Sequence, residues 1–231
     1  MARSSGGKIV TDGLVLALDA ANDKSYPGTG TTWTDLSGNG NNGTLVNGVG
    51  YNSGNSGSLT FDGSNDYVGV GDIGIDFGGI DVWVYLNNTI TSSTSHMSLL
   101  GYGDYTQSQI SFGAASGYAT DETMTILQGT SGNYGRTYIK DTINSGWNNI
   151  VIQWNGSNFD FYINGASKTT YNGTQGQAIQ ETMNDFRLGD TSGAGGTTFN
   201  GKISITKIYN RALTADEVLQ NFNATRGRFG I

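Results

Sequence analysis

Short segments that alternate apolar and polar residues recur along the chain, separated by clusters of glycine and asparagine. The segment "LVLALDA" places Leu14, Leu16 and Leu18 on one face of a strand, and "SLTFDG" (58–63) and "DYVGV" (66–70) show the same spacing. A period of two is typical of antiparallel β-strands that bury one face. About a dozen such segments predict an all-β fold in which two antiparallel sheets pack face to face.

One segment, "IDVWVYL" (80–86), carries large apolar side chains on both faces. Ile80 and Val82 point to one side of the expected strand, and Trp83 and Tyr85 point to the other. A strand with two apolar faces is covered on both sides, or it bends under a loop. We expect one of these two arrangements for this strand.

The turns depend on glycine and asparagine, since Pro27 is the single proline and glycine occurs 37 times. In "FDFYINGASKTTY" the dipeptide Asn164-Gly165 separates two alternating runs, which predicts a two-residue type I′ hairpin. The segment "DLSGNGNNGTLVNG" (35–48) begins with the oxygen-ligand spacing of an EF-hand loop, but its twelfth position is Val46 where that loop needs glutamate. We expect a looped turn here, with positive φ at four glycines: Gly38, Gly40, Gly43 and Gly48.

A single helix is expected, within "LTADEVLQNFNATRG" (213–227) near the C-terminus. Thr214 followed by Glu217 forms a capping-box signature, and Gly227 is placed to end the helix. The apolar stripe that predicts its docking face consists of Val218, Leu219 and Phe222. The apolar-tipped segment after it either packs back or binds a partner.

Composition excludes several classes of function. The chain has 12 basic and 19 acidic residues and a net charge of -7, so it should repel nucleic acid. Apolar stretches stay below the length of a membrane span, which predicts no membrane insertion. Because cysteine is absent, there is no disulfide framework and no thiolate metal site.

Catalytic chemistry has few candidate groups. His96 is the sole histidine, and it lies in a polar loop, where a histidine is usually an exposed residue without a catalytic role. Glycoside hydrolysis needs two close carboxylates, but Glu122, Glu181 and Glu217 are far apart in the sequence. The 16 aspartates leave open a pair formed in space. We expect a protein that is not an enzyme.

Glycan recognition needs exposed aromatic rings beside amide and carboxylate groups, and three loops offer them. Aromatic residues in loops serve loop packing as often as ligand binding, so both interpretations stay open. The candidate glycan-binding residues are Tyr102, Asp104, Tyr105, Tyr118, Asn133 and Tyr134.

Calcium is the one cofactor that the sequence suggests. "FDGSNDYV" (61–68) places three oxygen-bearing side chains in one expected turn, and calcium binds carboxylate and carbonyl oxygens. The alternative is that these residues only form the turn. The candidate calcium ligands are Asp35, Asp62, Asn65 and Asp66.

In order along the chain, five stretches resemble the laminin-G-like, concanavalin A-like lectin/glucanase jelly roll. They are "GLVLALDAAN", "WTDLSGNGNNGTLVNG", "SLTFDGSNDYVGVGD", "GWNNIVIQWNGSNFDFYINGA" and "FNGKISITKIYNRALTADEVLQNF". The resemblance implies a two-sheet sandwich, often a sugar-binding or adhesive module and in one branch a retaining glucanase. The glucanase signature E-x-D-x-x-E has no counterpart here. Ser204 stands where the family often has an aspartate that supports calcium.

The segments "YPGTGTTWTDLSGNGNNGTLVNG" and, at the C-terminus, "YNRALTADEVLQNFNATRGRFGI" are most similar to the corresponding segments of virion proteins of tailed bacteriophages. This resemblance implies a capsid-decorating or tail-associated protein, assembled in the host cytoplasm and exposed after release. Its expected partners are capsid or tail proteins and cell-surface glycans. Residues 1–12 are expected as a leader, 13–225 as one jelly-roll domain and 226–231 as a tail, with both end segments able to dock.

The function expected from the sequence is that of a non-enzymatic virion surface protein that adheres to glycans or to a host surface. A free-standing carbohydrate-binding lectin is the second hypothesis, and a glycoside hydrolase is the third.

Overall fold

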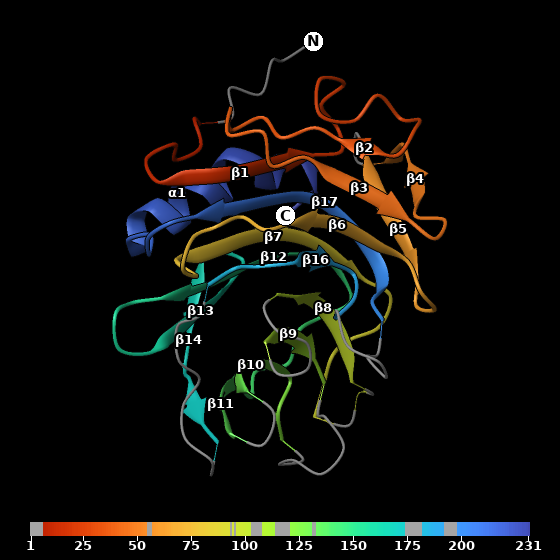
Figure 1. Ribbon diagram of the computed structural model, residues 1–231. Coiled ribbons are helices and arrows are strands. Elements are labelled where there is room, and N and C mark those ends of the chain that lie inside the picture. Colours follow the sequence, from red (N-terminus) through yellow and green to blue (C-terminus); the bar gives the residue numbers. More distant parts are fainter. Residues whose placement is uncertain are drawn as a thin grey trace.

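The computed structural model of the chain describes residues 7–54, 57–92, 94, 96–102, 108–113, 121–130, 133–173, 182–191 and 198–231, with the side chains of 128–130, 133 and 134 excepted. The described strands form two sheets in which the paired strands are antiparallel. Figure 1 shows helix α1 (Ala215–Thr225) above strands β17, β7 and β12, with β8 to β11 below them. The predicted two-sheet antiparallel sandwich with one short C-terminal helix is confirmed.

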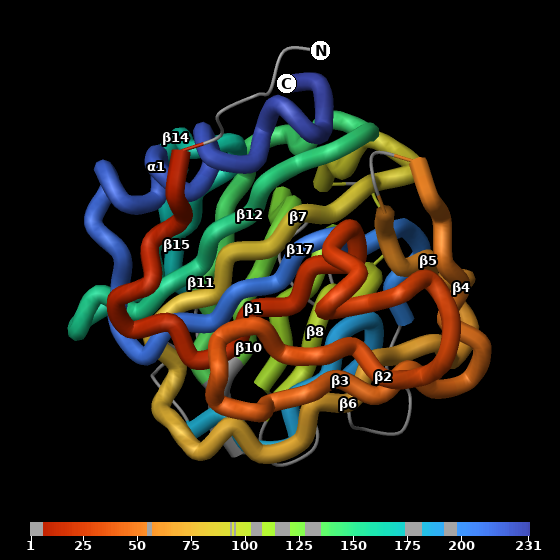
Figure 2. Tube along the Cα trace, turned by 90° about the horizontal axis from the view of Figure 1, so that it is seen from above, coloured from red at the N-terminus to blue at the C-terminus, as the bar shows by residue number. Residues whose placement is uncertain are grey.

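The first sheet has eight strands, and β17 is the strand that joins its two halves. Figure 2 shows four of these strands, β12, β7, β17 and β1, side by side. Their order is β14 (Ala166–Lys168), β13 (Phe159–Ile163), β12 (Gly146–Trp154), β7 (Gly79–Leu86), β17 (Asn200–Tyr209), β5 (Ser58–Asp62) and β4 (Gly50–Asn52), with β1 (Leu14–Asp19) also paired to β17.

The second sheet has nine strands and contains the edge strands β15 and β2. The order of the nine strands across this sheet is β15 (Tyr171–Asn172), β11 (Asn133–Ile139), β10 (Met124–Thr130), β9 (Gln109–Phe112), β8 (Met97–Gly101), β16 (Phe186–Leu188), β6 (Tyr67–Gly71), β3 (Gly43–Val46) and β2 (Thr32–Trp33).

The main core fills the space between the sheets with aliphatic and aromatic side chains from alternate strand positions. Ile80, Val82 and Val84 of β7 enter this core, as their alternation predicts. The largest fully buried members are Trp33, Tyr102, Phe77, Phe112, Phe159, Phe161, Phe186 and Phe199. Burial of so many large side chains accounts for a sandwich that holds together without disulfides.

The outer side of the eight-stranded sheet is covered by α1 and the C-terminal segment. The ring of Trp83 lies 4.0 Å from that of Phe229 and 5.9 Å from that of Phe222, centroid to centroid. Trp147 lies 4.7 Å from Phe229, and the indole N–H of Trp83 donates to Thr225 Oγ1 at 2.9 Å. Strand β7 is therefore covered on both faces, which is the first of the two expected arrangements.

Both end segments contact this outer layer. Val10 is buried and its N–H donates to Asn221 Oδ1 at 2.8 Å, while Gln220 donates to the carbonyl of Lys8 at 2.8 Å. In the C-terminal segment Phe229 is buried and Ile231 remains exposed. Of the two alternatives for this segment, packing back is the one that the structure shows.

Helix α1 begins as the sequence predicts. Thr214 Oγ1 accepts a hydrogen bond from the N–H of Glu217, and Glu217 Oε2 accepts one from the N–H of Thr214, which completes the capping box. The helix ends at Thr225, before the expected Gly227, because the chain tightens into a 3₁₀ turn, η2 (Arg226–Arg228). Asn164 and Gly165 both have positive φ, which confirms the type I′ hairpin between β13 and β14.

Three local expectations are wrong. Leu14 leaves the face shared by Leu16 and packs on the outer side, because the register with β17 shifts between the two residues. Leu219 is 45% exposed, so it lies outside the docking face of α1. Gly43 lies in β3 without positive φ, and its lack of a side chain serves close packing, since a Cβ there would lie 2.6 Å from Val68 Cγ1.

Among the described residues, no helix has both the length and the apolar character that crossing a membrane requires.

The capping box generates a pH-dependent prediction. Hydrogen bonds from Arg211 and from the N–H of Thr214 hold the pKa of Glu217 at about 2, below its ordinary 4.5. Because the folded pKa is the lower one, the stabilisation is present above pH 4.5 and is lost as the pH falls toward 2. We expect Glu217→Gln to lower the free energy of unfolding by about 1 kcal/mol at pH 7 in urea denaturation, and by less at acid pH.

The control for this prediction is Asp216→Asn, which removes a neighbouring acid from the first turn. This substitution should lower the free energy of unfolding by only a few tenths of a kcal/mol, which is the contribution of one acid to the helix dipole. A Glu217→Gln deficit that is the same at pH 7 and pH 2.5 would contradict the assignment.

The stacked aromatic layer generates a second prediction. Phe229→Ala removes the ring that contacts both Trp83 and Trp147, and we expect a loss of about 3 kcal/mol in unfolding free energy with a change in tryptophan fluorescence. Ile231→Ala, at an exposed position two residues later, should change stability by less than about 0.5 kcal/mol. Equal effects of the two substitutions would show that the segment does not pack as described.

Candidate functional site

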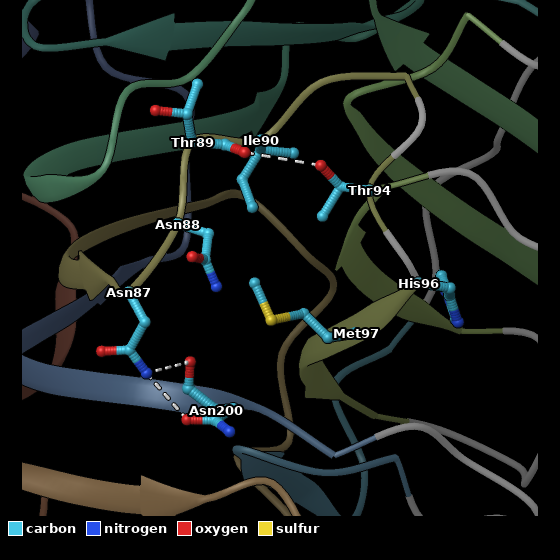
Figure 3. Close-up of a pocket in the computed structure, with 8 residues that line it drawn as sticks. All are labelled: Asn87, Asn88, Thr89, Ile90, Thr94, His96, Met97 and Asn200. Atoms are coloured by element: carbon cyan, nitrogen blue, oxygen red, sulfur yellow. Dashed lines mark hydrogen bonds between the residues drawn. The ribbon is translucent and has the colours of Figure 1, made fainter.

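A polar pocket lies at one end of the sandwich, where the chain passes from β7 in one sheet to β8 in the other (Figure 3). Its volume is about 420 Å³, within the usual range of small-molecule sites. Among the described residues, those that line it are Asn87, Asn88, Thr89, Ile90, Thr94, His96, Met97 and Asn200.

The loop that forms most of this pocket is anchored at both sides. Ile90 is buried and exchanges two backbone hydrogen bonds with Ile143, at 2.7 and 3.1 Å. Asn87 Nδ2 donates to Asn200 Oδ1 at 2.8 Å, which ties the loop to the first residue of β17. The loop is therefore tied to β17 and to the segment that precedes β12, and such anchoring favours a preformed site.

The lining groups are neutral hydrogen-bonding groups with an apolar part. The side chains of Asn88 and Met97 point toward the middle of the pocket in Figure 3, and His96 lies on the side opposite Asn87 and Asn200. None of the eight lining residues is acidic, and none is lysine or arginine. Asparagine both donates and accepts hydrogen bonds, so the pocket suits a neutral ligand with many hydroxyl groups.

His96 separates this pocket from a second polar cluster. Burial lowers the pKa of His96 below its ordinary 6.5, so the imidazole is neutral at pH 7. Behind it, Arg136 Nη2 forms an ion pair with Glu122 Oε1 at 2.9 Å, and Thr125 Oγ1 donates to Glu122 Oε2 at 3.0 Å. The crevice around this pair has no room for a water molecule.

Glu122 has the environment of a structural carboxylate. Burial raises its pKa, and the charge of Arg136 and the hydrogen bond from Thr125 oppose that rise. A general acid needs access to substrate and a partner carboxylate across the scissile bond. Among the described residues that line the crevice, Glu122 is the only acid. We find no paired carboxylates for hydrolysis there.

The structure places the predicted glycan-binding residues differently from the expectation. Tyr102 is 1% exposed and stacks on Phe77 with 5.5 Å between ring centroids, so it belongs to the core and is not an exposed platform. Asn133 and Tyr134 lie in β11, but their side chains are outside the described residues. The remaining three candidates, which also lie outside the described residues, are Asp104, Tyr105 and Tyr118.

Asp35 organises its own loop. Its Oδ1 accepts hydrogen bonds from the N–H groups of Ala17 and Ser37, at 2.9 and 2.8 Å, and its Oδ2 accepts from Ser37 Oγ and the N–H of Asn41, at 2.7 and 3.1 Å. Burial alone would raise the pKa of Asp35, but these hydrogen bonds lower it. The carboxylate thus accepts the hydrogen bonds that the loop N–H groups would otherwise donate to water, as in an Asx turn.

The other candidate calcium ligands also take part in local hydrogen bonds. Asp66 Oδ2 accepts from the N–H of Asp62 at 3.0 Å, Asp62 Oδ1 accepts from Ser64 at 2.7 Å, and the carbonyl of Asn65 accepts from Asn47 at 2.9 Å. Burial raises the pKa of Asp66. Within the described ranges, no three acidic or histidine side chains gather as a metal site, so Asp35 is not brought together with Asp62 and Asp66.

Ser204 has a structural role at the position where an aspartate was expected. Its hydroxyl donates to the carbonyl of Gly57 at 2.6 Å and accepts from Arg228 Nη2 at 2.7 Å. Arg228 also binds both carboxylate oxygens of Asp19, at 2.9 and 3.0 Å. Ser204 thus links Arg228 to the backbone at Gly57.

Sequence reasoning missed the pocket residues. The run Asn87-Asn88-Thr89 after β7 carried a signal, since consecutive amides at a strand end indicate a polar loop. Asn200 carried none, because it lies 113 residues from Asn87 and meets it only through the pairing of β17 with β7.

Several solved structures resemble the chain. Domain 4 of AbnA, an extracellular arabinanase from Geobacillus stearothermophilus solved with arabinotriose, is 19% identical with a TM-score of 0.67, over 90% of this chain and 97% of that one. The binding domain of Paraclostridial Mosquitocidal Protein 1 is 18% identical with a TM-score of 0.61, over 93% and 52%. Trypanosoma rangeli sialidase is 14% identical with a TM-score of 0.62, over 94% and 33%.

These similarities establish the fold. The chain spans nearly all of the arabinanase domain, about half of the toxin domain and about a third of the sialidase. No curated protein sequence matches it. The model of the concanavalin A-like lectin/glucanases superfamily matches residues 62–219, which is more than half of the chain. The chain therefore belongs to the concanavalin A-like lectin/glucanases superfamily.

Proposed function

We propose that the protein is a non-enzymatic module that binds neutral glycans through the pocket between β7 and β8. The observation that carries this proposal is the lining of that pocket: amide and hydroxyl side chains around an apolar part, without a charged lining residue. Sugar hydroxyls donate and accept hydrogen bonds, and asparagine matches both roles. Met97, which is half-buried and points into the pocket, offers apolar contact to the C–H face of a sugar ring.

The same lining supports the non-enzymatic part of this proposal. Cleavage of a glycosidic bond commonly needs an acid and a base or nucleophile on either side of it, and the eight lining residues include no carboxylate. Neutral His96 alone does not replace such a pair. The arabinanase domain with the same fold was solved with arabinotriose, which supports an oligosaccharide as the ligand class.

For the biological setting, we propose the surface of a tailed-bacteriophage virion, on the capsid or the tail. The support is the resemblance of "YPGTGTTWTDLSGNGNNGTLVNG" and "YNRALTADEVLQNFNATRGRFGI" to virion proteins. A cohesive sandwich with few charged residues is physically suited to an exposed particle surface. Its partners there are capsid or tail proteins together with the glycans of the host surface.

Glycan binding is tested on an array that includes neutral oligosaccharides, arabinotriose among them, and sialylated ones. We expect binding to neutral members, because no cation in the pocket lining pairs with a carboxylate sugar. Asn88→Ala removes an amide that points into the pocket and should weaken binding by about tenfold, measured by calorimetry as Kd. The matched control is Asn223→Ala, an exposed amide on α1, which should leave Kd unchanged.

Two loop variants locate the ligand. If Tyr105→Ala or Tyr134→Ala abolishes binding while Asn88→Ala does not, the protein is a lectin whose site is not this pocket. Exclusive binding of sialylated glycans would contradict the proposed ligand class. Turnover of any β-glucan or arabinan, measured as released reducing ends, would overturn the non-enzymatic assignment.

The virion setting makes a separate prediction. Quantitative mass spectrometry of purified particles of the source phage should find the chain in a fixed copy number that survives high-salt washing. Its absence from washed particles would overturn the setting and leave the glycan-binding proposal intact.

A further inference from the structure

A buried polar cluster lies between the eight-stranded sheet and helix α1, away from the proposed glycan pocket. Asp81 on β7 is directly opposite Lys207 on β17, and Asn221 on α1 lies over them. The exposed fractions of these three residues are 0%, 3% and 0%. Around them is the apolar outer layer that includes Val151 and Val218.

Asp81 brings an amine and a carboxamide into contact with the same oxygen atom. Lys207 Nζ lies 2.8 Å from Asp81 Oδ2, and Asn221 Nδ2 lies 3.0 Å from that same Oδ2. The amine of Lys207 and the amide of Asn221 therefore both lie within hydrogen-bonding distance of one oxygen atom. Asn149 Nδ2 binds the other oxygen, Oδ1, at 2.6 Å.

The carbonyl of Asn221 is held by a backbone donor. The N–H of Val10 donates to Asn221 Oδ1 at 2.8 Å. The hydroxyl of Tyr209 accepts from Asn221 Nδ2 at 3.0 Å and donates to the carbonyl of Val10 at 3.0 Å. Burial, with the charge of Asp81, raises the pKa of Tyr209, so this hydroxyl keeps its proton. The orientation of the carboxamide is thereby fixed.

We propose that Lys207 and Asn221 join in a self-catalysed isopeptide bond, with Asp81 as the residue that transfers the protons. Each component of an amide-forming site is in place. Lys207 supplies the nucleophile, Asn221 the electrophilic carbon, and the N–H of Val10 a donor for the oxygen on which negative charge develops. Asp81 contacts both the attacking and the leaving nitrogen.

The reaction balances without a co-reactant. Asp81 takes a proton from the ammonium of Lys207, and the resulting amine attacks Cγ of Asn221. The bond between Cγ and Nδ2 of Asn221 then breaks as Asp81 returns its proton to the leaving Nδ2. Asp81 next takes the second proton from the nitrogen of Lys207, which becomes the amide nitrogen. The products are a Lys207–Asn221 amide and one ammonia, which leaves as ammonium when it takes up the remaining proton.

Burial and proximity both favour this step. Transfer of the proton within the Lys207–Asp81 pair replaces two buried charges by two neutral groups, which a low-dielectric environment prefers. Fixed neighbours react as if at very high concentration. The product would tie α1 to β17 covalently in a chain without cysteine.

The test is the intact mass of the folded and aged protein, measured after denaturation. We expect a mass lower than that of the amino-acid sequence by about 17 Da, the mass of one ammonia. Peptide mapping should find residues on either side of Lys207 and Asn221 in one branched peptide, with no tryptic cleavage after Lys207. An unshifted mass would overturn the proposal without any variant.

Matched variants separate this bond from other losses of ammonia. Lys207→Arg keeps the positive charge opposite Asp81 and should have its full sequence mass, as should Asn221→Ala. Asn223→Ala removes an exposed amide on α1 that takes no part in the cluster and should retain the mass deficit. A 17 Da deficit that persists in Lys207→Arg, or that maps to an Asn-Gly dipeptide as a succinimide, would overturn the proposal.

Discussion

The carboxylate of Asp81 is the charge on which the outer half of the molecule depends. It lies fully buried, and its hydrogen-bonding partners come from β17, β12 and α1. Leaving such a charge unpaired costs several kcal/mol, so these elements must arrive together for the fold to be stable. Through Asn221 the same network reaches Val10, which fixes the N-terminal segment on the helix.

This requirement explains why the eight-stranded sheet carries a third layer. Helix α1 has a capped start and few apolar contacts of its own, and a helix of this length is marginal by itself. Trp83 and Phe229 hold the C-terminal segment on the sheet by stacking. The hydrogen bond from Asn221 to Asp81 is directional, so it sets the rotation of the helix about its axis. Asp81 and Trp83 occupy successive outward-facing positions of one strand, β7.

The glycan pocket uses the opposite chemistry. Its asparagine amides are exposed, and its loop is anchored through Ile90 and through the hydrogen bond between Asn87 and Asn200, while the amide of Asn88 points into the pocket. Buried polar groups such as Glu122 and Asp35, in contrast, already have their partners. This division is what separates a binding role from a structural one in a protein whose polarity comes mostly from neutral side chains.

The sequence by itself determined the features that depend on neighbouring residues. Alternation set the strands, Asn164-Gly165 set a hairpin, and Thr214 with Glu217 set the start of the helix, because each depends on local backbone geometry. The tertiary structure decided which residues meet across the sheets. The order of the strands is not encoded in their alternation, and a single register shift moved Leu14 to the other face.

Side-chain roles therefore came from the fold. The sequence suggested that Tyr102 is an exposed ring in a loop, but it lies in the core. Its burial depends on its contact with Phe77, which is distant in the sequence. Asn200 meets Asn87, and Asn221 meets Lys207 and Asp81, through pairings between distant parts of the chain. The sequence supplied the chemical groups, and the sheet order decided which of them share a site, because contacts between distant segments depend on long-range pairing and not on local propensity.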